Sequence, residues 1–382
     1  MKIAQILGEM MISIRTAGLL ALLWASISPG ILRAAEHESA GPEIVKVTFN
    51  HPQAADIAWS GDGRYLASAG LGSLTNWFGR QSVDPTVAIW DVRRKSLVGA
   101  YRRPGPFTYV SLIGPKPDVV SFDSTAAGWT REVSFSVWDA RTGQLLRHVP
   151  GNTSAENPRA IQLNQPRVYS YNPATGLFAV ARGTDGKVHI YDAEAWTEVD
   201  TLDVGMPPFS LEFSPDGRSL AVRQWHYVTI FDRISHKTVS RFRPYLGVTG
   251  GIAWGSDSKR IATIYFQAKL RSEGPAEEIP GGDAAIKIWD VESGKFLTGL
   301  SGDFDEAALV SSPISWSADG QYIAAVAQAS GMRKFLLWKI NGRRSPFTVD
   351  SDPKSVGPIR FSPATPTLAS AGLDGLHVYE IH

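Results

Sequence analysis

The stretch VAIWD (87–91) decides the fold, because related copies of it return six times along the chain of 382 residues. Each copy is a short run of alternating apolar residues that ends in an aromatic residue, usually followed by Asp. The strong copies are FSVWD (135–139), VHIYD (188–192), VTIFD (228–232) and IKIWD (286–290), and the weaker ones are FLLWK (335–339) and LHVYE (376–380). The aromatic residues lie about 40 to 58 residues apart, which is typical of a repeated four-stranded unit with loops of variable length.

A second signature precedes the first in most units: a short apolar strand, a polar turn and a strand rich in small residues. Clear copies are IAWSGDGRYLASAG (57–70), LEFSPDGRSLAV (211–222), ISWSADGQYIAAV (314–326) and IRFSPATPTLASAG (359–372), and looser copies span 169–181 and 252–264. Asp-Gly pairs at 62–63, 216–217 and 319–320 predict type I′ hairpin turns, in which both central residues have positive φ. A further strand follows most aromatic residues, at 95–101, 144–149, 237–242 and 295–300.

Closure of the repeat can be predicted from the two ends of this region. The last unit reaches His382 without a strand after Tyr379, whereas EIVKVTF (43–49) has the pattern of an outer strand and no place in the first unit. Pairing 43–49 with the strand that ends at Tyr379 would close a ring and leave no open edge. After the first 35 residues no segment shows helical periodicity over ten residues. The sequence therefore predicts an all-β fold, a seven-bladed β-propeller closed by an N-terminal strand, over residues 43–382.

The repeated aromatic–Asp ending resembles that of WD40 repeats, and the chain from about Glu43 to His382 is similar to a seven-bladed propeller of that family, of an exported bacterial type. One family feature is absent. No copy opens with the Gly-His pair that normally begins a WD unit, and neither His51 nor His148 replaces it. We therefore do not expect the buried hydrogen-bond network between His and Asp that characterises the family.

Residues 1–35 differ in pattern from the rest. Basic residues precede the apolar run AGLLALLWASI (17–27), and the small pair Ala34-Ala35 follows it. A basic start, a short apolar core and a small-residue exit predict a secretory signal peptide. An uncleaved N-terminal anchor is the alternative, because Arg33 makes a poor cleavage site. We expect a periplasmic or secreted protein that contacts the membrane only through this segment.

Composition disfavours several classes of partner and site. There are 38 basic and 37 acidic residues, a formal net charge of +1, so we expect no nucleic-acid partner. The absence of Cys excludes disulfides, thiolate metal sites and cysteine nucleophiles. The eight His residues show no metal-ligand spacing. We therefore predict no metal site, no cofactor and no catalytic residue, and we expect a monomer.

Five repeated Asp residues have a structural interpretation: Asp91, Asp139, Asp192, Asp232 and Asp290. Each precedes a tight turn, where an Asp carboxylate can accept hydrogen bonds from backbone N–H groups one or two residues later. Because they hold the same place in every blade, they would lie too far apart to act together.

Long loops join the predicted second and third strands at 71–85, 123–132 and 267–283, and a short aromatic turn does so at 223–227. All would open on the face that also carries the connections between blades. Loops carry function more often than frameworks do, and Trp, Tyr and Arg dominate binding hot spots. The candidate partner-binding residues are Trp77, Phe78, Arg80, Trp129, Arg131, Trp225 and His226. The alternative is that Trp77 and Trp129 only pin their own loops to the rim.

The favoured function is a non-catalytic, exported scaffold that binds a protein or peptide partner through one loop-rich face. The alternative is a small-molecule-binding or enzymatic propeller, quinoprotein-like or lactonase-like, that uses the central channel. A structural subunit of an envelope complex is a third. The predicted inner strands offer mostly Ala, Ser, Ile and Trp to the channel, which favours binding over catalysis.

Overall fold

Twenty-nine strands make up the regular structure of the described residues in the computed structural model. These residues are 42–51, 54–70, 86–102, 108–113, 118–127, 130–139, 141–149, 169–181, 185–224, 226–245, 249–265, 280–281, 284–302, 306–307, 314–329, 332–342, 346–350, 357–372 and 374–382. Residues 44–382 pack as one unit. Within the described ranges, no helix is long and apolar enough to cross a membrane.

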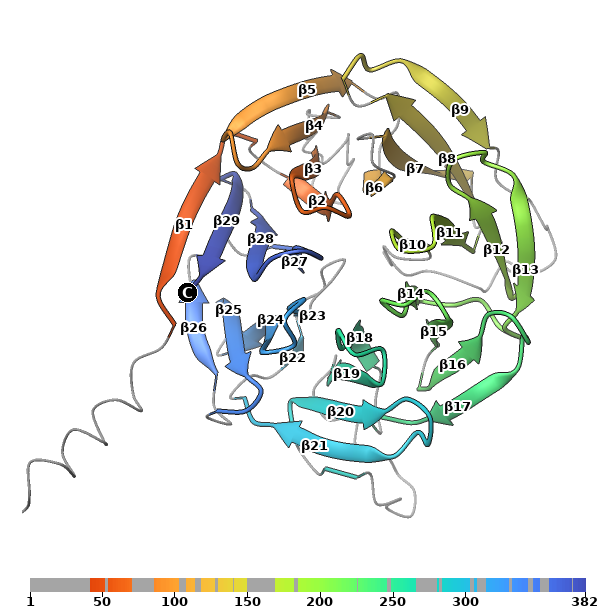
Figure 1. Cartoon of the computed structure of the whole chain (residues 1–382), viewed down its shortest axis with the longest axis vertical. Helices are drawn as coiled ribbons and strands as arrows, with labels where there is room; N and C mark the ends of the chain where they lie inside the picture. Colours follow the sequence, from red (N-terminus) through yellow and green to blue (C-terminus); the bar gives the residue numbers. More distant parts are fainter. Residues whose placement is uncertain are drawn as a thin grey trace, which may run out of the picture. The chain divides into compact units, whose positions relative to one another are not determined.

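The strands form seven antiparallel sheets around a central axis, each with its first strand nearest the axis (Figure 1). Blade 1 contains β2 (Ala54–Trp59), β3 (Tyr65–Gly70), β4 (Thr86–Asp91) and β5 (Ser96–Arg102). Blade 2 contains β6 (Thr108–Ile113), β7 (Asp118–Ala127), β8 (Thr130–Asp139) and β9 (Leu145–Val149). Blade 3 contains β10 (Tyr169–Asn172), β11 (Leu177–Val180), β12 (Lys187–Asp192) and β13 (Glu198–Asp203).

The second half of the ring repeats this order. Blade 4 contains β14 (Ser210–Phe213), β15 (Ser219–Arg223), β16 (Val228–Asp232) and β17 (Thr238–Phe242). Blade 5 contains β18 (Thr249–Trp254), β19 (Arg260–Tyr265), β20 (Ile286–Asp290) and β21 (Phe296–Leu300). Blade 6 contains β22 (Glu306–Ala307), β23 (Ile314–Trp316), β24 (Tyr322–Ala329), β25 (Met332–Lys339) and β26 (Phe347–Asp350), with β22 and β23 both paired to β24. Blade 7 contains β27 (Ile359–Phe361), β28 (Thr367–Ala371), β29 (Leu376–Ile381) and β1 (Ile44–Phe49).

The predicted closure of the ring by the N-terminal strand is confirmed. β1 runs antiparallel to β29, from the pair Ile44 and Ile381 to the pair Phe49 and Leu376. β29 would otherwise be an open edge with nearly all of its side chains buried. The seven-bladed, all-β fold predicted from the repeats is therefore correct.

Burial explains the repeated sequence patterns. Third strands such as β20 are buried along nearly their whole length, because each blade is covered by a neighbour on both faces. The second strands carry small residues, and Ala67, Ser68 and Ala69 are fully buried, since the blades crowd together toward the axis. Outer strands such as β9 are mostly exposed.

Strand order defines the two ends of the propeller. Successive antiparallel strands are joined at alternate ends. One end, which we call the loop face, carries the connections from second to third strands and from each blade to the next. The opposite end, the turn face, carries the connections from inner to second strands and from third to outer strands.

The inner hairpins are not the type I′ turns that the Asp-Gly pairs predict. Gly63 has a φ of 67°, but Asp62 is not among the residues with positive φ. The Gly63 N–H donates to the Ser60 carbonyl at 2.9 Å, and the Ser60 N–H donates to the Tyr65 carbonyl at 2.9 Å. Four residues therefore separate the strands, a loop length that combines an ordinary turn with one left-handed glycine.

Blade 2 corrects another prediction. Within the predicted loop 123–132, residues 123–127 and 130–132 belong to strands, and the hairpin of β7 and β8 extends as far as the pair Ala127 and Thr130. Polar residues such as Ser124 and Thr125 suggested a loop, but cross-strand pairing extends to them.

Six outer strands carry a bulge, five of them beside the repeated aromatic residue and the sixth, in blade 6, opposite Phe335 and Leu336. The extra residue is aliphatic in every case: Val98, Leu146, Val199, Val239, Leu297 and Val349. Bulges twist an edge strand and oppose pairing with other chains. The outer wall is therefore protected against edge-to-edge association even though several of these aliphatic side chains are exposed.

Candidate functional site

The turns that follow five of the third strands share one construction. The Asp that ends the strand accepts hydrogen bonds, 2.7 to 3.1 Å long, from backbone N–H groups two or three residues later. The acceptors are Asp91, Asp139, Asp192, Asp232 and Asp290. These carboxylates hold turns in five different blades.

Hydrogen bonding also sets the charge of these groups. The backbone N–H of Arg141 lowers the pKa of Asp139, and the Ser235 N–H does the same for Asp232. Burial alone would raise the pKa of Asp91, but hydrogen bonds from the Arg94 N–H and the Arg64 guanidinium outweigh it and lower the pKa. These three carboxylates are therefore ionised at neutral pH and act as fixed acceptors.

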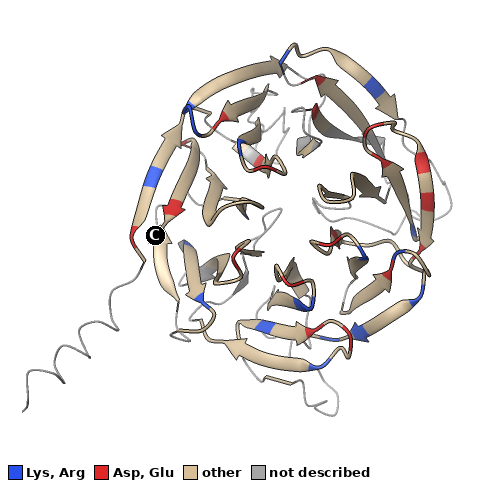
Figure 2. Ribbon diagram, viewed as in Figure 1, with Lys and Arg blue, Asp and Glu red and all other residues tan. Residues whose placement is uncertain are grey.

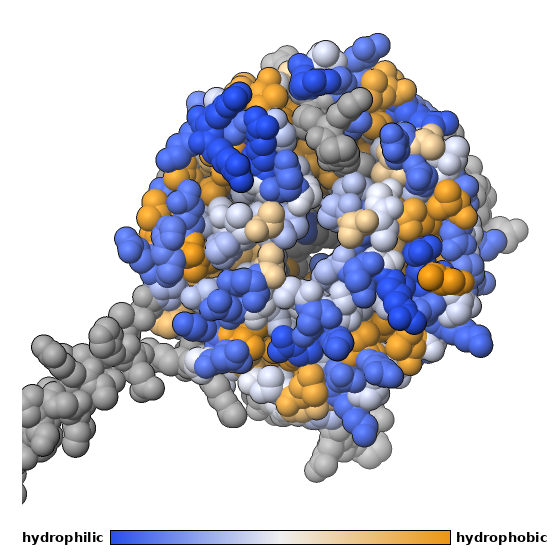
Figure 3. All heavy atoms as spheres, in the orientation of Figure 1, coloured by the Kyte–Doolittle hydropathy of each residue, from blue (hydrophilic) through white to orange (hydrophobic). Residues whose placement is uncertain are grey.

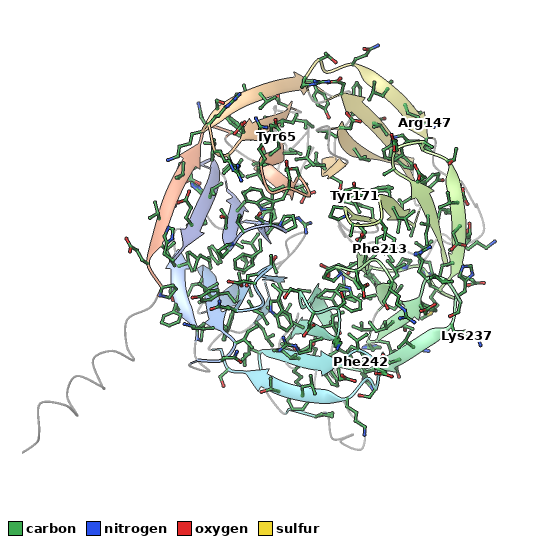
Figure 4. The ribbon with its side chains drawn as sticks, in the orientation of Figure 1. Tyr65, Arg147, Tyr171, Phe213, Lys237 and Phe242 are labelled. Atoms are coloured by element: carbon green, nitrogen blue, oxygen red, sulfur yellow. The ribbon has the colours of Figure 1, made fainter. Side chains whose placement is uncertain are left out.

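The central channel is the first candidate site. A cavity of about 240 Å³ is lined by the inner strands of blades 1 to 4 and 7, including Ser111, Glu212 and Arg360. Tyr171 and Phe213, which also line it, lie at the inner edge of blades 3 and 4 (Figure 4). The cavity therefore offers one carboxylate, one guanidinium and several aromatic rings.

Five hydrogen bonds among the described residues of the inner strands join neighbouring blades. The donors and acceptors are Phe213 N–H to Ser170 Oγ (3.0 Å), Phe361 N–H to Ser315 Oγ (2.9 Å), Arg360 Nε to the Ile57 carbonyl (2.9 Å), Trp59 Nε1 to the Arg360 carbonyl (3.0 Å) and Trp254 Nε1 to the Glu212 carbonyl (3.0 Å). Among the residues that the structure describes, no three His, Asp or Glu side chains are grouped to hold a metal ion. The hydrogen bonds of Ser170, Ser315 and Arg360 therefore fasten neighbouring blades to one another.

The loop face is the second candidate site, for which the sequence predicts seven residues. Trp77, Phe78, Arg80, Trp129 and Trp225 lie outside the described residues. Arg131 belongs to β8, where it pairs with Ala126, and its side chain also lies outside them. His226 is half-buried in the turn between β15 and β16.

Gln224 connects two segments of the described part of this face by hydrogen bonds. Its side-chain amide is 5% exposed and donates to the carbonyls of Val204 and Met206, both at 3.0 Å. Its backbone N–H donates to the Tyr227 carbonyl at 2.9 Å. Gln224 thus fixes the connection between blades 3 and 4 against the aromatic turn of blade 4.

Around Gln224 lies a small group of side chains that sequence reasoning missed. Met206 is 49% exposed, and the Arg241 guanidinium lies 4.2 Å from the centre of the Tyr227 ring. Met, Tyr and Arg are enriched at protein interfaces. Tyr227 lies within the predicted aromatic turn 223–227. Arg241 is distant in the sequence and comes close to Tyr227 because β17 pairs Arg241 with Thr229 of β16.

Two buried cations hold the junction of blades 4 and 5. Arg223 donates to the Thr249 carbonyl at 2.7 Å, and burial lowers its pKa to about 10. Lys287 donates to the Pro244 carbonyl at 3.2 Å and lies over the Tyr245 ring. Both cations therefore secure backbone that forms the loop face.

His51 takes part in a buried hydrogen-bond network with Ser68 and Trp90 of blade 1. The side chain is 4% exposed, and its Nδ1 contacts the Ser68 hydroxyl, which also accepts a hydrogen bond from Trp90 Nε1 at 3.0 Å. The sequence signal for this network is a hydroxyl on the second strand, two residues after the residue that pairs with the repeated Trp. Thr263 and Trp289 make the corresponding bond in blade 5.

Comparison with known proteins supports the fold. No protein-family model matches the chain. A WD-repeat protein, Periodic tryptophan protein 2 of Arabidopsis thaliana, is 29% identical over 142 residues. The match covers 37% of this chain and 14% of that protein. A seven-bladed propeller with partial similarity to a WD-repeat protein fits a protein-binding scaffold in general.

Proposed function

We propose that the protein is a non-catalytic, exported propeller that binds a protein or peptide partner through its loop face. The observation that carries the proposal is that polar side chains of the channel wall already form hydrogen bonds between blades. Ser170, Ser315 and Arg360 each form a hydrogen bond with a neighbouring blade, so these groups serve the ring itself. We therefore expect side chains from the connections of the loop face to contact the partner.

The group around Gln224 supports the choice of this face. Met206 and Arg241 are exposed, and Tyr227 is half-buried beneath the Arg241 guanidinium. Trp225 lies within the same short turn of the chain, and Trp77, Phe78, Arg80, Trp129 and Arg131 are the candidates from blades 1 and 2. A partner that spans blades 1 to 4 would meet aromatic and Arg side chains, the residue types that dominate hot spots.

A second candidate function is small-molecule binding in the channel, which the cavity with Glu212 and Arg360 favours. Replacing Glu212→Gln removes the carboxylate while keeping its size. Under our proposal this variant captures the partner as well as the parent does. A loss of partner capture in Glu212→Gln would place the binding site in the channel instead.

Export is part of the proposal and can be tested on the native protein. We expect the intact mass of protein purified from the periplasm or medium to lack about the first 35 residues. The control is Leu20→Arg with Leu23→Arg, which puts charges into the apolar run and should hold the full-length chain in the cytoplasm. A parent protein that stays in the cytoplasm and begins at Met1 would contradict export.

A further inference from the structure

Lys95 occupies a backbone conformation that costs free energy for any residue with a Cβ atom. Its φ is 53°, in the turn between β4 and β5. The corresponding turns of blades 2 and 5 place Gly143 (69°) and Gly294 (66°) at this position, and those of blades 3 and 4 place Trp196 (55°) and His236 (59°). A side chain retained where glycine fits needs a physical reason.

The other non-glycine residues with positive φ among the described residues have such a reason. Trp196 packs 5.7 Å from the Phe135 ring of the preceding blade. His236 Nε2 lies 2.9 Å from Asp200 Oδ2, again on the preceding blade. Ser258, in an inner hairpin of blade 5, accepts a hydrogen bond from the Asp216 N–H of blade 4 at 3.1 Å. Each gains a contact between blades.

Lys95 gains no such contact. The side chain is exposed, and no described residue forms a hydrogen bond or ion pair with its ammonium group. Arg93 and Arg94 precede it in the same turn and are also exposed. Packing against the described residues therefore does not compensate the backbone strain at Lys95. Its side chain faces solvent.

Arg64 brings a fourth cation to this corner. It comes from the inner hairpin of blade 1, lies over the Tyr65 ring at 4.9 Å and pairs with Asp91 at 3.1 Å. We call Arg64, Arg93, Arg94 and Lys95 the basic turn. Figure 2 shows the blue turn between β4 and β5, and Figure 3 shows strongly hydrophilic atoms over the same corner.

The charges of the basic turn are only partly neutralised. Asp62 and Asp91 are the carboxylates that bond to its residues, and the Asp91 side chain is 3% exposed. Four cations against two carboxylates leave a local excess of positive charge on a chain whose total formal net charge is +1. The excess is presented outward, since the main carboxylate lies beneath the cations.

We propose that the basic turn binds an acidic segment of a protein partner. Guanidinium groups recognise carboxylates in a paired, directional geometry. An anionic membrane is a poorer match, because the four basic residues are only the lower end of the roughly 4–8 that membrane-binding clusters contain, and two carboxylates offset part of their charge. Nucleic acids draw on about 6–10 phosphate contacts. The excess charge at this corner is too small for either surface.

The basic turn belongs to the turn face, because it joins a third strand to an outer strand. It lies at the opposite end of the blades from the loop face and is independent of the binding proposed there. A propeller with both sites can hold two partners at once.

The test measures fluorescence anisotropy of a short, fluorescein-labelled, glutamate-rich peptide at about 50 mM salt. The glutamine version of the peptide, anionic vesicles and a single-stranded oligonucleotide are compared in the same buffer. The parent should prefer the glutamate peptide to all three. The triple variant Arg93→Ser, Arg94→Ser, Lys95→Gly should weaken peptide binding at least about tenfold.

The matched control removes three exposed Lys residues from turns of blades 4 and 5: Lys237→Ser, Lys259→Ser and Lys295→Ser. It changes the net charge equally and should weaken binding less than about twofold. Equal weakening by both triple variants, no preference for the glutamate peptide, or tighter binding of vesicles or oligonucleotide would each overturn the proposal.

A stability measurement tests the premise that the backbone at Lys95 is strained and that no contact of its side chain compensates the strain. Lys95→Gly relieves the strained backbone and should raise the melting temperature by about 1–2 °C. His236→Gly relieves the same strain but loses the contact with Asp200, so its melting temperature should rise less or fall. If Lys95→Gly lowers the melting temperature as much as Trp196→Gly does, Lys95 is a packing residue and the inference is wrong.

Discussion

Deletion of residues 43–49 should open the last blade and make the protein aggregate. The deletion removes the six residue pairs between β1 and β29 and the packing of Phe49, Val47 and Ile44. Phe49 is 4% exposed and the other two are half-buried. Loss of these contacts costs roughly 3 to 6 kcal/mol, a large part of the 5–15 kcal/mol that typically stabilises a domain.

The reason for aggregation is the edge that the deletion exposes. β29 would present unpaired backbone groups along a strand of largely apolar residues, which is a template for pairing with other chains. The expected result is a lower melting temperature by circular dichroism and higher oligomers by light scattering. Deleting residues 36–42 is the control, because it leaves β1 in place. A deletion variant that stays monomeric with the parent's melting temperature would show that β1 does not close the ring.

Trp77→Ala and Trp129→Ala should each weaken partner capture about thirtyfold while leaving the melting temperature nearly unchanged. Truncation of a binding hot spot typically costs at least about 2 kcal/mol, which corresponds to that factor. The alternative, in which each Trp pins its own connection to the rim, predicts the reverse, because a pinning Trp contributes buried area to folding. Affinity and melting temperature are measured for each variant.

Trp196→Ala is the matched control for these two variants. Trp196 packs against Phe135 and Phe178 on the turn face, so its truncation should lower the melting temperature and leave partner affinity unchanged. If Trp77→Ala and Trp129→Ala both unfold early but bind normally at low temperature, they are rim anchors and the partner site lies elsewhere.

The repeated framework was predictable because burial on both faces imposes it. Third strands such as VAIWD (87–91) are covered by two neighbouring blades, so their apolar pattern recurs in every unit. The pattern of 43–49 predicted closure for the same reason, since an outer strand has one covered face. Local turn geometry was harder: the Asp-Gly pair at 62–63 is compatible with two hairpin lengths, and only the pairing of Ser60 with Tyr65 decides between them.

The sites were less predictable, because they depend on contacts between blades. His51 lacks a preceding Gly, yet it reaches Ser68 and Trp90 through the connection from blade 7. Nothing in the sequence around Lys95 indicates a left-handed backbone, since a Lys in a polar turn is ordinary. Its backbone stands out only beside the glycines at the same position in blades 2 and 5.

Site-specific photo-crosslinking tests the central claim, binding through the loop face, most directly. Met206 (49% exposed) lies on the loop face, and Ile234 (73% exposed) lies on the turn face. Both are exposed apolar residues, so the same benzoylphenylalanine probe can replace each of them. Irradiation in living cells, followed by mass spectrometry, identifies what each position touches. Our account predicts a crosslinked partner protein from position 206 and none of that partner from position 234. The same partner crosslinked from position 234 but not from position 206 would contradict it.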